Sequence, residues 1–131
     1  GDMHEHAGFH AFQSMVASLS FRPEYYNANR AKLLGSGGVW GALEGRIPTH
    51  LRFIEACLGH DIRPHLSEIV APTLVIHAGE DMITGPRTTM PLEEGLPNSV
   101  GVSMDRVAHV VAGKEEKIIF GENLFDFLNA H

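Results

Sequence analysis

The apolar run Thr73–Ile76 constrains the fold of this chain more than any other segment. Its sequence, Thr-Leu-Val-Ile, is rich in β-branched residues, and Pro72 and Gly79 bound it on the two sides. Continuous apolar runs of this length and composition are typical of strands that are buried on both faces of a parallel sheet. We therefore expect an α/β fold that contains this run as a strand.

A helix, a second strand and a closing helix are predicted after this run. The first helix is expected to begin near Thr84, a suitable N-cap, and to extend towards Leu96. Residues 100–104 alternate between apolar and other side chains, as a strand does. The order strand–helix–strand implies parallel strands joined by a crossover. The closing helix spans 114–130, and its inner side is expected to consist of Ile118, Ile119, Leu124, Phe125 and Leu128.

The first half of the chain is predicted to be helical and interrupted by turns. Apolar residues recur at three- and four-residue steps over 9–19, and prolines suit the first turns of helices over 23–34 and 48–59. In the last of these helices, burial is expected for Leu51, Ile54, Cys57 and Leu58. We divide the chain into a helical segment, 1–61, and a strand-containing segment, 62–131.

The composition is that of an ordinary globular protein, and it excludes some functional classes. The 131 residues suffice for one compact domain, with 44% apolar and 20% charged residues. The formal net charge of -6 argues against nucleic-acid binding, which normally requires a basic surface. No apolar run is long enough to predict a membrane span. The single cysteine, Cys57, rules out an intramolecular disulfide and favours a reducing, cytoplasmic location.

Two residues capable of acid–base chemistry follow the predicted strands. Asp81 comes shortly after the first strand, and His109 follows the second. Neighbouring parallel strands lie about 4.8 Å apart, and ligands bind beyond their carboxyl ends, so the two side chains can meet there. Such a carboxylate orients the imidazole and stabilises its protonated form during acyl transfer. Taken singly, each residue also has an ordinary structural interpretation. Asp81 belongs to Gly-Glu-Asp, a common turn sequence, and His109 is then a solvated histidine in a loop.

Several stretches of the second half resemble the C-terminal part of the α/β-hydrolase family. They are Leu66–Ile69, Ala71–Ile76 with Gly79-Glu80-Asp81, Val107-Ala108-His109, and Phe125–Leu128. The resemblance implies a partial α/β-hydrolase fold with Asp81 as the catalytic acid and His109 as the catalytic histidine, in the family's chain order. It also implies that 1–61 forms a helical cap or lid. The implied reaction is hydrolysis of a small-molecule carbonyl substrate, such as an ester or lactone, without a cofactor.

The chain departs from the family's pattern at two points. Ala108 stands where the family usually has a glycine before the histidine. The nucleophile elbow, Gly-x-Ser-x-Gly between a strand and a helix, has no counterpart among the seven serines. Ser36, in Gly-Ser-Gly-Gly, follows a predicted helix and not a strand. We therefore expect the C-terminal portion of an enzyme, inactive by itself.

Two alternative interpretations stay open at this point. In the first alternative, the chain is a non-catalytic association module derived from the hydrolase scaffold. Because a two-stranded pair leaves both edges open, we expect a homo-oligomer, pairing with a missing N-terminal portion, or coverage of the strands by the helical first half. His4, His6 and His10, with Glu5, could ligate a divalent metal, but histidines near a terminus are commonly adventitious ligands, and no metal site is predicted.

Overall fold

The two predicted strands are present and pair in parallel in the computed structural model, which describes residues 2–131. The described chain forms two compact units. The first comprises residues up to Leu19 and Pro23–Asp61, and the second comprises Ser20–Arg22 and Ile62–His131. Over these described residues, no helix has the combination of length and apolar character that crossing a bilayer requires.

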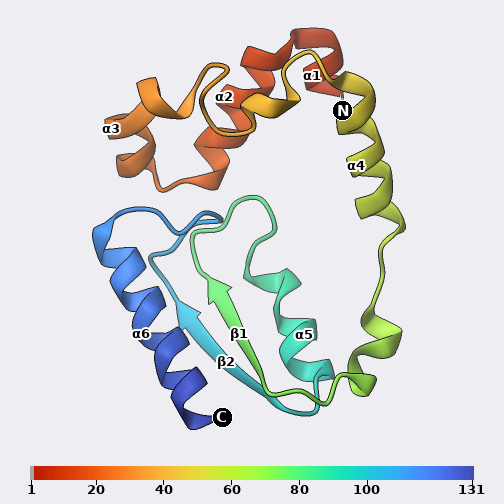
Figure 1. Cartoon of the computed structure of the whole chain (residues 1–131), viewed down its shortest axis with the longest axis vertical. Helices are drawn as coiled ribbons and strands as arrows, with labels where there is room; N and C mark the ends of the chain where they lie inside the picture. Colours follow the sequence, from red (N-terminus) through yellow and green to blue (C-terminus); the bar gives the residue numbers. More distant parts are fainter. Residues whose placement is uncertain (1) are drawn as a thin grey trace. The chain divides into compact units, whose positions relative to one another are not determined.

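The first unit is helical. It contains α1 (Asp2–Ala7), α2 (Phe9–Ser20), α3 (Pro23–Leu33), the short 3-10 helix η1 (Gly41–Leu43) and α4 (Ile47–Gly59), shown in red to yellow in Figure 1. The three helices predicted here are confirmed, and α4 has a proline in its first turn. Helix α1 was not predicted, because its sequence is polar; it forms with His4 buried at 3% exposure.

The core of the first unit contains polar groups as well as apolar ones. Its buried side chains include Phe9, Phe12, Ala17 and Leu33, together with Gln13. Gln13 fixes the loop after α3, because its amide donates to the carbonyls of Gly35 and Val39 at 2.9 and 2.7 Å. The same amide accepts the N–H of Gly35 at 2.7 Å, so this buried side chain satisfies its hydrogen bonds within the unit.

The inner face predicted for α4 is wrong in its second half. His50 is the buried residue of this helix, whereas Leu58 is 82% exposed and Leu51 is also exposed. Cys57, expected to be buried, is exposed as well. The physical reason is that only the first turns of α4 pack against other parts of the unit, since every residue from 55 to 61 is exposed.

The second unit is built around the strand pair β1 (Thr73–Ala78) and β2 (Ser99–Met104). The register runs from Thr73 opposite Ser99 to Ala78 opposite Met104. The predicted single helix between them is instead η3 (Pro86–Thr88) followed by α5 (Met90–Gly95). Gly85, with a φ of 70°, lies outside helical geometry, so the helical residues begin after it and not at Thr84.

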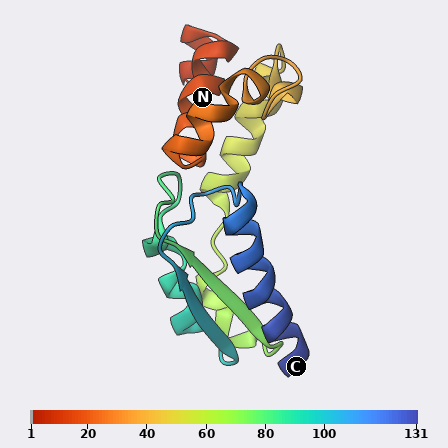
Figure 2. The ribbon, with the colours of Figure 1, turned by 90° about the vertical axis from the view of Figure 1, so that its left-hand side faces the viewer.

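Helix α6 (Lys114–Ala130) has the predicted bounds, and η2 (Arg63–Glu68) precedes β1. Helices α5 and α6 lie on opposite sides of the strand pair in both views (Figures 1 and 2).

The predicted inner side of α6 is wrong, because Ile118, Phe125 and Leu128 are 50%, 65% and 58% exposed. Burial of the strands on both faces is also not observed. Two strands are too narrow a layer to cover the apolar faces of the elements around them.

Candidate functional site

Asp81 and His109 meet where the two parallel strands end. The Asp81 carboxylate oxygen Oδ2 lies 3.0 Å from Nδ1 of His109, and the two side chains are 10% and 34% exposed. Backbone hydrogen bonds continue beyond the strands, from Gly79 N–H to the Met104 carbonyl (3.0 Å) and from Glu80 N–H to the Val107 carbonyl (2.9 Å). The two loops therefore run side by side, which brings the acid and the imidazole into contact.

The Asp81 carboxylate is held by a turn of its own loop. Oδ1 accepts the backbone N–H groups of Ile83 (2.8 Å) and Thr84 (3.0 Å), and Oδ2 accepts the Thr84 hydroxyl at 2.7 Å. Partial burial by itself would raise the pKa of Asp81. The hydrogen bonds from Thr84, His109 and Ile83 outweigh burial and hold this pKa well below its usual range. Thr84, predicted as a helix N-cap, serves the carboxylate instead, and Asp81 is ionised at neutral pH.

An ionised acid determines which ring nitrogen of His109 carries the proton. A carboxylate only accepts hydrogen bonds, so Nδ1 of His109 must donate to it. The neutral imidazole then presents an unprotonated Nε2, the form that a general base requires. The neighbouring Val107 and Ala108 are buried at 3% and 2% exposure and fix the backbone of this loop. Ala108 does not have a positive φ, so this turn does not require the glycine of the family pattern.

A partly buried ion-pair network lies beside this pair and was not predicted from the sequence. Arg22 Nε contacts Glu80 Oε2 at 3.2 Å, and Arg22 Nη1 contacts Glu116 Oε1 at 3.4 Å. Glu116 also accepts the N–H of Ala112 at 3.0 Å. Arg22 precedes Glu80 by 58 residues and Glu116 by 94, and no sequence pattern links residues so far apart.

A cavity of about 320 Å³ lies next to the network. Its lining includes Arg22, Ser103, Asp105, Val107, Glu116 and Ile119. Neither Asp81 nor His109 belongs to this lining, so the cavity is not a substrate pocket built around the acid–histidine pair.

A second histidine–carboxylate contact joins β1 to α5. His77 Nδ1 lies 2.7 Å from the Thr89 hydroxyl, and its Nε2 lies 2.6 Å from Glu93 Oε2. The carboxylate of Glu93 packs over Gly101 of β2, where any Cβ would overlap it. His77 therefore connects the strand to the helix that follows it.

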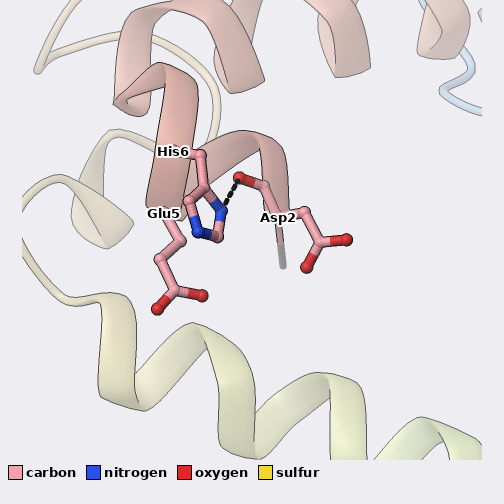
Figure 3. A group of neighbouring side chains, drawn as sticks. All are labelled: Asp2, Glu5 and His6. Atoms are coloured by element: carbon pink, nitrogen blue, oxygen red, sulfur yellow. Dashed lines mark hydrogen bonds between the residues drawn. The ribbon is translucent and has the colours of Figure 1, made fainter.

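The N-terminal histidines separate into different environments. His4 and His50 form a buried pair in the first unit, with 2.8 Å between their Nδ1 atoms, and both rings lie against Phe12. Burial lowers the pKa of His50, and the neighbouring His4 lowers it further. His6 instead lies with Asp2 and Glu5 on the exposed side of α1, where their ligand atoms are within 4.8 Å of one another (Figure 3).

That exposed cluster is a poor candidate for a metal site. His6 Nδ1 already interacts with the Asp2 carbonyl at 3.1 Å, and all three side chains are exposed. His4 is turned into the core and His10 is exposed elsewhere on α2, so the four residues considered from the sequence do not converge.

The serines do not complete a triad. Ser36 lies in the glycine-rich loop that follows α3, as predicted, and Ser20 is fully buried. No serine of the described chain occupies a turn between a strand and a helix within a Gly-x-Ser-x-Gly frame.

Comparison with known proteins adds no relative: no family model, curated protein or solved structure matches the chain.

Proposed function

We propose that this chain is the C-terminal portion of an α/β-hydrolase-type enzyme that cleaves a small carbonyl substrate, an ester or a lactone. One observation carries the proposal: an ionised carboxylate and a histidine Nδ1 lie 3.0 Å apart at the carboxyl ends of two adjacent parallel strands. Ligands of parallel α/β sheets bind at this edge. In this proposal, residues 1–61 are the helical cap.

The two residues would act in sequence on a serine supplied from outside these 131 residues. Nε2 of His109 takes the proton of the serine hydroxyl while the serine oxygen bonds to the substrate carbonyl carbon. His109 then donates that proton to the leaving alcohol as the C–O bond breaks. Water repeats both steps and releases the acid. Asp81 keeps its charge throughout and stabilises the imidazolium, so no cofactor is needed.

The test uses the natural reading frame that contains this chain. The encoded protein should hydrolyse short-chain p-nitrophenyl esters, and Asp81→Asn should lower kcat by about 10⁴-fold, as expected when the acid of such a triad is neutralised. His109→Ala should do the same or more. Gly121→Ala, on α6, is the matched control and should leave kcat unchanged. A reading frame with no upstream Gly-x-Ser-x-Gly elbow, or activity that survives His109→Ala, would contradict the proposal.

A second candidate is a non-catalytic association module. The observation that favours it is the apolar surface of α6, where a groove is lined by Ile118, Gly121 and Phe125 among others. Both edges of the two-stranded sheet are also unpaired within the described residues. The covering surface would be a second copy of the chain or a further segment of the same protein. Sedimentation of this chain should therefore show self-association at micromolar concentration, and a stable monomer would count against self-pairing.

The compartment is also a proposal. The single cysteine is exposed and unpaired, which is compatible with a reducing environment such as the cytoplasm.

A further inference from the structure

We propose that the Ser20–Arg22 segment positions the acid–histidine pair, and that Arg22 is the positioning residue. The inference rests on the proposed function, because positioning of His109 matters to catalysis only if His109 acts as a base. The contacts of Arg22 described above are with Glu80 and Glu116. It acts through Glu80, the residue directly before Asp81 in the chain.

The acid loop is held through Glu80 on two sides. The Glu80 side chain accepts a hydrogen bond from Arg22 Nε at 3.2 Å, and its backbone N–H donates to the Val107 carbonyl at 2.9 Å. Glu80 therefore connects the Ser20–Arg22 segment to the loop that carries His109. Removing the Arg22 guanidinium would free the Glu80 side chain and loosen the residue from which Asp81 continues.

The histidine loop is held on both sides of His109. Val107, two residues before it, is fixed by Glu80, and the N–H of Val110, directly after it, donates to the Ser20 carbonyl at 2.9 Å. The same short segment thus contacts the acid loop through the side chain of Arg22 and the histidine loop through the backbone of Ser20. Two loops fixed by one segment keep a constant separation.

Burial makes the Arg22 contacts selective for arginine. The side chains of Arg22 and Glu116 are only 15% and 10% exposed, so their charges need partners inside the unit. Arg22 reaches Glu80 with Nε and Glu116 with Nη1, two different nitrogens of one planar group. A lysine has a single nitrogen and cannot hold both carboxylates in this geometry.

The experiment measures the His109 tautomer in this chain by long-range ¹⁵N NMR of the imidazole. In the parent chain the neutral ring should be protonated at Nδ1. Arg22→Met keeps the aliphatic stem and should shift the ring towards the tautomer mixture of an unconstrained histidine. Arg22→Lys should restore the parent tautomer only in part. A purely structural role would lower the urea midpoint without changing the tautomer of the folded variant.

Two control variants separate positioning from general damage. Arg106→Met removes a second, exposed arginine beside the same cavity, and Ser103→Ala removes a hydroxyl from the lining of that cavity. Both should keep the parent tautomer. If Arg22→Met does not fold, Glu80→Leu tests the same contact from its more exposed end and should shift the tautomer as well. A parent tautomer in folded Arg22→Met, or in Glu80→Leu, overturns the inference.

The natural reading frame distinguishes this inference from the proposed function. There, Arg22→Met should lower kcat by about 10- to 100-fold with KM unchanged, as expected for misplacement of a base. If no variant or parent hydrolyses esters while Arg22→Met still shifts the tautomer, the proposed function fails and the positioning role stands. If His109→Ala abolishes hydrolysis while Arg22→Met changes neither kcat nor the tautomer, only the positioning inference fails.

Discussion

Each unit of the molecule contains a short contact at a histidine Nδ1, and the two contacts differ in their partner. In the helical unit, His50 Nδ1 lies 2.8 Å from Nδ1 of His4. In the strand-containing unit, His109 Nδ1 lies 3.0 Å from a carboxylate oxygen of Asp81. The first pair is buried among aromatic rings, whereas the second lies at a strand end, where His109 is partly exposed.

The partner determines how each contact responds to protonation. Two imidazoles share a hydrogen bond only while one of the facing nitrogens is unprotonated, because imidazolium has no acceptor. A carboxylate keeps accepting whether His109 is neutral or protonated. The contact in the helical unit is therefore lost when both rings are protonated, whereas the contact in the second unit allows His109 to gain and lose a proton without losing its partner. The second property is the one that acid–base catalysis requires.

The variant with the largest expected effect is Gly79→Ala, which disturbs the contact between Asp81 and His109 through the backbone. A Cβ at Gly79 would lie 2.6 Å from the Asp105 carbonyl oxygen and 2.8 Å from its Cα, so Gly79→Ala must push the two loops apart. We expect a loss of about 1–3 kcal/mol in the free energy of unfolding, as for overpacking elsewhere. In the control Gly121→Ala, the new Cβ meets nothing within 4 Å, and α6 should gain about 0.5–1 kcal/mol. Urea denaturation measures both, and equal midpoints for the two variants would contradict the close approach at Gly79.

A second prediction concerns the imidazole pair. The lowered pKa of His50 means that the unfolded chain binds more protons below about pH 6.5, so stability is present above that pH and is lost as the pH falls. The loss should reach up to about 1.4 kcal/mol per pH unit for one proton. Trp40, the only tryptophan, lies in the helical unit, and its fluorescence reports this loss between pH 7 and 5.

The control for this prediction replaces both histidines. Removing both partners of a buried hydrogen bond is nearly neutral, so the double variant His4→Leu/His50→Leu should fold and should show a flatter pH response over the same range. An unchanged response in the double variant would show that the pair is not the origin of the acid sensitivity.

A third, smaller effect belongs to Asp81. Its lowered pKa means that stability from this group is complete above about pH 4 and is lost only as the pH falls further, towards the folded-state value. Asp81→Asn should therefore lower the urea midpoint at pH 6 and narrow the difference between pH 5 and pH 3. NMR signals of the backbone amides in β1 and β2 report the unfolding of the strand-containing unit as the pH is lowered. A variant that is as stable as the parent at pH 6 would disprove a net stabilising role of the ionised carboxylate.

The sequence alone predicted the local elements and the one contact that depends on strand geometry. The two strands and α6 have bounds within two residues of those expected, because their patterns are continuous and turn residues bound them. The meeting of Asp81 and His109 follows from the fixed spacing of parallel strands, so two sequence positions sufficed to predict it.

The parts that were missed depend on neighbours distant in the sequence. The inner faces expected for α4 and α6 are exposed, because burial depends on how many layers pack on a helix and not on its periodicity. Arg22 and the His4–His50 pair are held by residues 46 to 94 positions away, for which no local pattern exists. The connection between the strands also differed, since Thr84 binds Asp81 in preference to capping a helix.

The most direct measurement of the central claim is the ¹⁵N spectrum of His109 at a pH where the ring is neutral, in the parent chain and in Asp81→Asn. If an ionised Asp81 orients this imidazole, the parent should carry its proton on Nδ1 and leave Nε2 free, and the variant should lose that preference. Protonation at Nε2 in the parent, or identical spectra for the two proteins, would contradict the assignment of His109 as a base held by Asp81.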